Sequence, residues 1–439
     1  MDMLRIGSGA GFAADRIDPA VRLIEQGRLD WIGFECLAER TLAQAQTVRA
    51  ADPAKGYNRF LEARMRACLP PALANGTRII SNMGAANPRA AAEAAARIGA
   101  GAGVAVAYVT GDDVMHLIGP DTLLQDIGMT VREFGRPLVS ANAYLGVEQI
   151  LPAIESDATV ILTGRTADPS LFLGPLVHAF GWALDDWAHL GAGTLVGHLL
   201  ECAGQVTGGY FADPGHKDVP GLADLGFPLC EVAADGTATV TKLPTDGGCV
   251  TAQTVKEQTL YEVHDPARYL TPDVTADFSR VRVREEGRDR VAIAGATGGP
   301  RPETLKVTVA FDGGMEAEAG ISYAGPGAAD RARLAADVLR QRLKDIAALR
   351  VDLIGISSLH GTLAAPSNLE RSEDVRVRVA ARTDDPDTAD RVLWEVEALY
   401  TCGPAGGGGV RGQVRRTFVT HDAYVPRDAI RAETGVIRP

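Results

Sequence analysis

The chain has 439 residues, of which 46% are hydrophobic and 23% are charged. This composition is typical of folded globular proteins and excludes disorder across the chain, and the length exceeds what one hydrophobic core usually supports, so we expect two domains. With 44 basic and 56 acidic residues the net charge is −12. Such an acidic chain lacks the basic surface that nucleic acids and anionic membranes bind, so we expect neither as a partner.

The amino-terminal residues are not typical of a targeting segment. The run MDMLRIGSGAGF has no basic region followed by an apolar one, and no apolar run in the chain is long enough to span a membrane. The six cysteines form neither a CxxC pair nor a zinc-binding spacing, which favours reduced thiols and predicts no metal. We therefore expect a cytoplasmic protein.

Short apolar segments alternate with helical segments along the first part of the chain. Apolar strands are predicted from Leu4 and at residues 30–36, 78–81, 104–109, 137–141 and 159–162. Helices are predicted between them, at residues 19–26, 61–74, 88–98 and 148–154. Strands separated by helices pair in parallel, so this part is predicted to be α/β. The pattern fits an open sheet or part of a barrel, and we favour the open sheet.

Polar side chains follow most of these predicted strands. They are Glu35, Asn82, Asp112, Asp113, Asn142 and Arg165. The carboxyl ends of parallel strands share one edge of a sheet, and in α/β folds that edge carries the ligand site. We therefore expect these residues to lie around one binding site.

The later part of the chain changes in character. A glycine-rich stretch near residues 204–248 retains apolar residues and is predicted to be an insertion in the first domain. The tail has strands at 305–311 and 317–323 and amphipathic helices at 330–344 and 387–400, an order typical of a small α+β domain. The predicted fold class is α/β: a parallel-sheet amino-terminal domain over residues 1–285 and a smaller α+β ferredoxin-like domain over residues 286–439.

Three glycines, Gly7, Gly9 and Gly11, come at the end of the first predicted strand. Their spacing is G-x-G-x-G, whereas the dinucleotide-binding turn needs G-x-G-x-x-G and an acidic residue further along. We interpret them as a turn that lets the strand end near a ligand, and we predict no cofactor.

Three side chains suit proton transfer. Glu35 and Arg40, in the run FECLAER, either bind an anion and move a proton or form a structural ion pair. Asp113, next to Asp112, is either a general base or a metal ligand, or it only caps a helix. Lys256, in TVKEQ, is either a partly buried base or oxyanion partner, or it forms an exposed pair with Glu257. We predict Glu35, Asp113 and Lys256 as catalytic residues.

Amide and guanidinium groups are predicted to bind the substrate. Asn82 and Asn142 can orient a carbonyl group, and Arg165 can hold a carboxylate or a phosphate. The run CGPAGGGGVRG either cradles an anion with its backbone N–H groups or is only a flexible loop. The predicted substrate-binding residues are Arg40, Asn82, Asn142, Arg165, Gly407, Gly408 and Arg411.

Two further patterns are interpreted as structural. His198, Glu201 and Gln205 share one face of a predicted helix, which we interpret as a solvated polar face rather than a metal site. Cys36 has no neighbouring partner in the sequence that would activate it, and we interpret it as a buried thiol.

The chain resembles the acyclic terpene utilisation AtuA family. The runs that carry the resemblance extend over almost the whole chain: RIGSGAGFAADRIDPAV, FECLAERTLA, SNMGAANP, VSANAYLG, TGRTADPSLFLGPLVHAFGW, GTLVGHLLECAGQVTGGYFADP, TVKEQTLYEVHDPARYLTPDV, ISYAGPGA and GPAGGGGVR. The resemblance implies an α/β domain followed by a ferredoxin-like domain, and a place in the degradation of branched terpenoids through CoA thioesters. It implies no particular reaction or set of catalytic residues.

Residues and resemblance together lead to a first hypothesis, an enzyme of branched-chain or terpenoid acid or acyl-CoA catabolism. We expect a hydratase- or lyase-type reaction on a small molecule bearing a carboxylate or CoA, with a CoA thioester as substrate rather than cofactor. The alternative is a non-catalytic scaffold or accessory subunit for acyl-CoA enzymes, and a nucleotide- or metal-dependent enzyme is a third hypothesis. We expect a homo-oligomer, with an acyl-CoA enzyme as a further partner.

Overall fold

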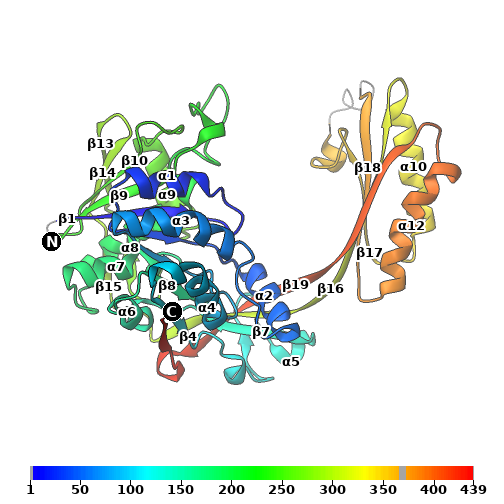
Figure 1. The fold of residues 1–439 in the computed structure, drawn as a ribbon. Helices are drawn as coiled ribbons and strands as arrows, with labels where there is room; N and C mark the ends of the chain where they lie inside the picture. Colours follow the sequence, from blue (N-terminus) through cyan, green and yellow to red (C-terminus); the bar gives the residue numbers. More distant parts are fainter. Residues whose placement is uncertain (1–2, 365–371, 439) are drawn as a thin grey trace. The chain divides into compact units, whose positions relative to one another are not determined.

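A computed structural model describes residues 3–364 and 372–438 of the protein (Figure 1). The chain divides into two compact units. Unit 1 comprises Met1–Ala310 together with Thr420–Pro439, and unit 2 comprises Phe311–Val419. Each unit has its own buried core.

The chain passes between the units within two long strands. It enters unit 2 within β16 (Thr304–Ala324) and leaves it within β19 (Gly408–Pro426). The predicted domain boundary at residues 285/286 lies within β13 (Arg282–Gly287), a strand of unit 1. The last residues of the chain return to unit 1, which a boundary placed at a single point along the sequence does not anticipate.

Unit 1 is built on an open, mixed sheet of ten strands with the order β13-β14-β10-β9-β1-β2-β3-β8-β4-β20. The five middle strands β1, β2, β3, β8 and β4 pair in parallel, as the alternation of strands and helices predicts. Antiparallel strands extend the sheet on both sides, so it is not purely parallel. The strands other than β13 are β1 (Met3–Ala10), β2 (Trp31–Phe34), β3 (Arg78–Ser81), β4 (Val106–Thr110), β8 (Val160–Thr163), β9 (Pro228–Ala233), β10 (Ala238–Lys242), β14 (Arg290–Ala294) and β20 (Glu433–Ile437).

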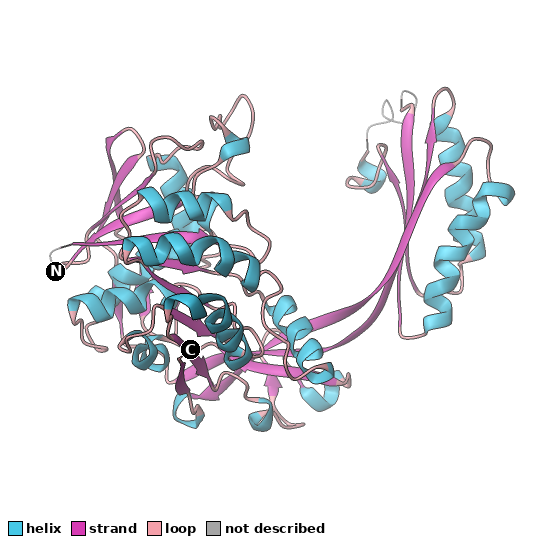
Figure 2. Cartoon of the chain, viewed as in Figure 1, coloured by secondary structure: helices cyan, strands magenta, loops and turns pink. Residues whose placement is uncertain are grey.

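Helices cover both faces of this sheet (Figures 1 and 2). On one face α3 packs against both α1 and α4, and on the other face α7 packs against both α6 and α8. Their bounds are α1 (Asp18–Gln26), α3 (Leu61–Asn75), α4 (Pro88–Gly99), α6 (Val147–Ile154), α7 (Ser170–Phe180) and α8 (Trp187–Glu201). Proline in the first turn begins α1 and α4, and Asn87 caps α4 by accepting the N–H of Ala90 at 3.3 Å.

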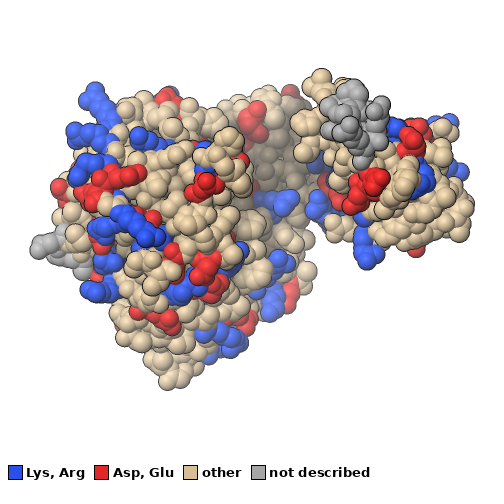
Figure 3. Space-filling view, turned by 90° about the horizontal axis from the view of Figure 1, so that it is seen from above, with Lys and Arg blue, Asp and Glu red and all other residues tan. Residues whose placement is uncertain are grey.

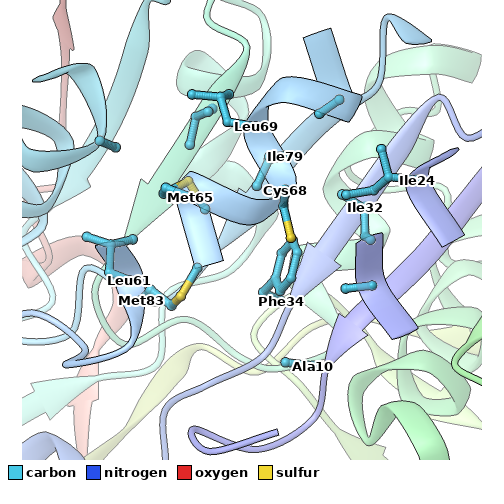
Figure 4. Packing of buried hydrophobic residues seen from close by; sticks show 14 of the residues in the cluster. Ala10, Ile24, Ile32, Phe34, Leu61, Met65, Cys68, Leu69, Ile79 and Met83 are labelled. Carbon is cyan, nitrogen blue, oxygen red and sulfur yellow. The ribbon is translucent and has the colours of Figure 1, made fainter. Parts of the chain in front are cut away.

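The core between the sheet and α1, α3 and α4 follows from amphipathic spacing. On α1, Ala20, Leu23 and Ile24 share one helix face and are fully buried. Figure 4 shows Cys68 of α3 pointing toward the ring of Phe34 of β2. Burying one large apolar side chain contributes about 1.5–3 kcal/mol, so this core is the main support of unit 1.

Two predictions about unit 1 require correction. The predicted strand at 137–141 forms β7 (Leu138–Ala143), but β7 pairs with β16 and does not join the parallel series. The glycine-rich stretch near 204–248 contains β9 and β10, which belong to the large sheet, so part of it is sheet core. Apolar spacing identifies a strand but does not say which sheet it joins, and this accounts for both differences.

Smaller elements complete unit 1. A three-stranded sheet has the order β11-β12-β15 and packs on α8, and β5 pairs with β6. The bounds are β5 (Leu123–Leu124), β6 (Met129–Thr130), β11 (Tyr269–Leu270), β12 (Thr275–Asp277), β15 (Thr297–Gly299), α2 (Glu39–Ala51), α5 (Val131–Phe134) and α9 (Ala252–Leu260).

Unit 2 has the element order β16, α10, β17, β18, α12, β19, and its strands lie in the order β17-β18-β16-β19. The bounds are α10 (Ala328–Arg342), β17 (Ala348–Ile354), β18 (Asp374–Thr383) and α12 (Pro386–Cys402). Val375, Val377 and Val379 alternate along β18 toward the buried side, where α10 and α12 pack. The segments 305–311 and 317–323, predicted as two strands, form the single strand β16.

Charged side chains of both signs are interspersed on the face of the molecule drawn in Figure 3. Within residues 3–364 and 372–438, no helix combines the length and the apolar character needed to cross a bilayer.

Candidate functional site

The chain leaves the neighbouring strands β3 and β8 toward opposite faces of the sheet. After β3 it continues into α4, and after β8 it continues into α7, which packs on the other face. In open α/β sheets, this divergence at the carboxyl ends of adjacent strands marks the ligand site. Asn82 follows β3 directly and Arg165 follows β8 by two residues, so we build the candidate site around these two residues.

Glu35, directly after β2, is joined to Asn82. Its Oε1 accepts the Asn82 Nδ2–H at 2.9 Å and the Leu37 N–H at 2.8 Å, while Asn82 Oδ1 accepts the Cys36 N–H at 2.8 Å. Burial raises the pKa of Glu35 to about 7, although the charge of Arg165 and these hydrogen bonds act to lower it. Near neutral pH this carboxyl therefore exists in both protonation states.

Arg165 is a fixed, buried cation at the centre of the site. Its side chain is 1% exposed, and the guanidinium donates to the carbonyls of Leu37 and Thr166 and to the carboxylate of Asp168. The ring of Tyr144 lies 4.5 Å from the guanidinium carbon. Since most of its N–H groups already have acceptors, Arg165 acts mainly through its charge, and its direct contact with a substrate stays a prediction.

Asp112 ties three chain segments together at this edge. Its Oδ2 accepts the backbone N–H of Arg165 and the Asn142 Nδ2–H, both at 2.9 Å. Burial raises its pKa to about 6. A Cβ at Gly164 would lie 2.4 Å from Asp112 Oδ1, so a glycine is required beside this carboxyl. Asp112 thus joins the ends of β4, β7 and β8.

Three predicted site residues lie at the surface, outside this cluster. The side chain of Asp113 is 45% exposed and lies 3.5 Å from Arg49 Nη1. Arg40 is exposed in the first turn of α2, and Lys256 is exposed on α9. Because successive residues in an extended chain point to opposite sides, Asp112 rather than Asp113 faces the interior.

Two residues that the sequence analysis did not single out complete the cluster. The hydroxyl of Tyr144 donates to Glu39 Oε1. Burial would raise the pKa of Glu39, but the hydrogen bond from Tyr144 and the charges of Arg165 and Lys306 outweigh burial and lower it. Glu39 lies in FECLAER and Tyr144 in SANAYLG, so both stand in runs already marked by Glu35 and Asn142.

His198 and Glu201 of α8 correct the sequence interpretation, because they are buried and not solvated. They are 1% and 8% exposed, and His198 Nδ1 lies 2.7 Å from Glu201 Oε1. The helix is apolar on nearly all sides, which favours complete burial over a solvated face. The rings of Tyr269 and Phe278 flank the imidazole at centroid distances of 5.4 and 6.0 Å.

The pair retains unused polar atoms. Within the described residues, His198 Nε2 and Glu201 Oε2 are buried and have no hydrogen-bond partner. The charge of Glu201 is one of the groups that raise the pKa of Glu35, so the pair is electrostatically connected to the site. Over residues 3–364 and 372–438, no three His, Cys, Asp or Glu side chains are placed to hold a metal ion.

The first glycines pack against protein rather than against a ligand. A Cβ on Gly9 would lie 2.4 Å from the ring of Phe34, and one on Gly11 would lie 2.3 Å from the backbone of Cys202. Gly11 therefore allows the end of β1 to approach the end of α8 closely. Cys36 is 1% exposed, and burial raises the pKa of its thiol, which agrees with its structural interpretation.

A family model described as acyclic terpene utilisation family protein AtuA matches residues 4–436. The chain belongs to this family. No curated protein and no solved structure matches the chain significantly. The match includes both units and connects the protein with acyclic terpene utilisation.

In this AtuA-family protein the remaining predicted residues, Gly407, Gly408 and Arg411, belong to unit 2. A Cβ on Gly407 would lie 2.8 Å from Ile321 Cδ1, whereas Gly408 has open space around it. Arg411 is exposed on β19 and donates from Nη1 to the carbonyl of Val410 at 2.8 Å.

Proposed function

We propose that this AtuA-family protein is an enzyme of branched-chain or terpenoid acid catabolism, which adds water to or removes it from a substrate carrying a carboxylate or a CoA thioester. One observation carries the proposal: Glu35 is a buried carboxyl with a pKa near 7, beside the fixed charge of Arg165. A general acid–base group works best when its pKa lies near the working pH.

Glu35 can supply both proton transfers of such a reaction. In the direction of water loss, the ionised carboxylate takes the proton from the carbon next to the substrate carbonyl, and the charge of Arg165 stabilises the enolate that forms. The hydroxyl group then leaves from the adjacent carbon and takes the proton from Glu35, so one water is released and Glu35 is ionised again. Hydration is the reverse sequence. Asn82 is the positioning residue, because its amide holds Glu35 Oε1.

The proton transfer can be measured without knowing the complete reaction. Purified protein is incubated in D2O with branched acids and branched acyl-CoA thioesters, and exchange at the carbon next to the carbonyl is followed by proton NMR. We expect exchange with at least one thioester or acid, and we expect its loss in Glu35→Gln. Asp113→Asn is the matched control, because Asp113 is an exposed carboxylate outside the cluster.

Two outcomes would contradict the proposal. One is exchange that survives in Glu35→Gln. The other is no exchange and no thermal stabilisation of wild type by any thioester or acid, since a ligand at ~100 times its Kd adds about 2.7 kcal/mol of stability. The second outcome, combined with co-purification of an acyl-CoA enzyme, would favour the accessory-subunit alternative.

We also propose that unit 2 is a ferredoxin-like module. The support is its β-α-β-β-α-β element order and the strand order β17-β18-β16-β19, in which β18 pairs antiparallel with both β16 and β17. The two helices pack on β18 and leave the other sheet face uncovered by them. Such sheets often serve association, and size-exclusion chromatography with light scattering would test the homo-oligomer that we propose.

A further inference from the structure

The uncovered face of the unit 2 sheet carries alternating charged residues. Along β18, Arg376 and Arg378 point to the side opposite the buried valines. Arg378 pairs with Glu318 and, at 3.0 Å, with Asp352. Arg415 pairs with Glu316. Glu316, Glu318 and Asp352 therefore already have arginine partners.

Arg376 and Arg411 differ from these neighbours. In the described part of unit 2, residues 311–364 and 372–419, neither guanidinium has a carboxylate within ion-pair distance. Arg376 Nη1 donates to Ser322 Oγ at 3.1 Å and to the Gly409 carbonyl at 3.2 Å, and its Nη2 donates to the Gly320 carbonyl at 3.1 Å. Arg411 Nη1 donates to the Val410 carbonyl at 2.8 Å. Consecutive carbonyls of β19 thus anchor both cations, and further N–H groups of each remain available.

The two cations line one pocket of about 210 Å³. Its walls are Glu318, Ala319, Gly320, Arg376, Arg411, Gly412 and Gln413. A Cβ on Gly320 would lie 2.7 Å from the Val377 carbonyl and 2.9 Å from Arg376 Nε, so the glycine makes room for the guanidinium. Glu318, the carboxylate of the pocket, is engaged by Arg378. The groups left for a ligand are guanidinium N–H donors and the Gln413 amide.

We propose that Arg376 and Arg411 bind a phosphate group, either free or carried by a small molecule. Planar guanidinium groups match the oxygen geometry of phosphate and bind it with two parallel hydrogen bonds, and two of them together favour a doubly charged anion over a singly charged one. The site lies wholly within unit 2 and is independent of the reaction proposed for Glu35.

Binding is measured by isothermal titration calorimetry on the full chain at low salt, with inorganic pyrophosphate, inorganic phosphate, adenosine 3′,5′-bisphosphate and acetate. We expect pyrophosphate to bind, and we expect Arg411→Gln and Arg376→Gln each to weaken it about tenfold, which corresponds to ~1.4 kcal/mol. Arg382→Gln is the matched control. It removes the same charge from an exposed position of β18, where Arg382 lies 3.7 Å from Glu316.

The relative affinities distinguish a phosphorylated nucleoside from free phosphate as the ligand. Tighter binding of the bisphosphate than of pyrophosphate would indicate a phosphorylated nucleoside ligand, and equal or weaker binding would indicate free phosphate. No pyrophosphate binding by wild type, or equal weakening in Arg382→Gln, would overturn the proposal. Arg411 is exposed and makes one hydrogen bond to the backbone, so Arg411→Gln tests the site even if Arg376→Gln misfolds. Glu35→Gln should retain pyrophosphate binding, which separates this site from the reaction proposed for Glu35.

Discussion

Asn82 Nδ2 donates a hydrogen bond to Glu35 Oε1 at 2.9 Å, and this contact joins the ends of the neighbouring strands β3 and β2. Both residues are buried, and Asn82 also accepts the N–H of Cys36. The amide therefore satisfies a backbone donor and a carboxyl group at the same time.

Asn82→Ala should destabilise unit 1 by about 1–3 kcal/mol, because it leaves the buried N–H of Cys36 without an acceptor and removes one of the two donors to Glu35 Oε1. Urea unfolding followed by tryptophan fluorescence measures this. A Trp394→Phe background leaves every tryptophan in unit 1. Asn75→Ala is the control, since Asn75 is exposed and donates one bond to the Ile24 carbonyl. Equal losses in the two variants would contradict the role given to Asn82.

The raised pKa of Glu35 predicts how stability changes with pH. Between its ordinary value of 4.5 and about 7, the folded protein binds a proton at Glu35 that the unfolded chain has released. The free energy of unfolding should therefore fall as the pH rises through this window. Because one unit of pKa shift corresponds to about 1.4 kcal/mol, the total fall should be about 3 kcal/mol.

Glu35→Gln removes this contribution, so the stability of wild type relative to the variant should fall by that amount between about pH 4.5 and 7.5. Urea unfolding at a series of pH values gives the difference curve. Asp112 has the same sign of shift but is present in both proteins and cancels. A difference curve that is flat, or that rises with pH, would show that Glu35 titrates normally.

The sequence predicts the parallel centre of unit 1 well because its signals are local. Asn87-Pro88 begins α4 and Gly76 ends α3 in a left-handed conformation, as their residue types predict. The rule that polar residues at strand ends share one edge also identified Glu35, Asn82, Asn142 and Arg165. These four join one buried cluster through Asp112, Leu37 and the Asn82 amide.

The features that the sequence did not predict depend on contacts between residues that lie far apart along the chain. The partner of β7 is β16, and β20 comes from the last residues of the chain to pair with β4. The choice between Asp112 and Asp113 depends on which side chain turns inward. His198 and Glu201 were assigned to solvent because their spacing on α8 is that of a polar pair, whereas burial is decided by the sheet β11-β12-β15 that packs on this helix.

Gly11→Ala should destabilise unit 1 by about 1–3 kcal/mol, as overpacking of a close contact does. The added Cβ would lie 2.3 Å from the carbonyl carbon of Cys202 and 2.6 Å from the Glu201 carbonyl oxygen, and backbone atoms cannot rotate aside. Gly119→Ala is the control, because its Cβ would meet no atom within 4 Å. Thermal unfolding of the two variants makes the comparison. Equal midpoints would contradict the close packing of β1 on α8.

The His198–Glu201 pair should behave as one energetic unit. Removing one member of a buried hydrogen-bonded pair leaves the polar group of the other without its partner, so His198→Ala and Glu201→Ala should each cost about 1–3 kcal/mol. The double variant should cost less than the two single losses combined, by about 1–3 kcal/mol. If the two single losses add up to the loss of the double variant within ~0.5 kcal/mol, the 2.7 Å contact contributes no coupling free energy.

Glu201 also offers a test of the connection between α8 and Glu35. The charge of Glu201 raises the pKa of Glu35, and Glu201→Gln removes that charge while keeping the side chain's size. In the Glu201→Gln background, the Glu35→Gln difference curve should therefore shift to lower pH, because an ionised Glu35 no longer faces a like charge. The matched comparison is Glu262→Gln, since Glu262 acts on Glu201 but is not among the principal groups that shift the pKa of Glu35. If the difference curve shifts further in Glu262→Gln than in Glu201→Gln, Glu201 is not the carboxylate whose charge raises the pKa of Glu35.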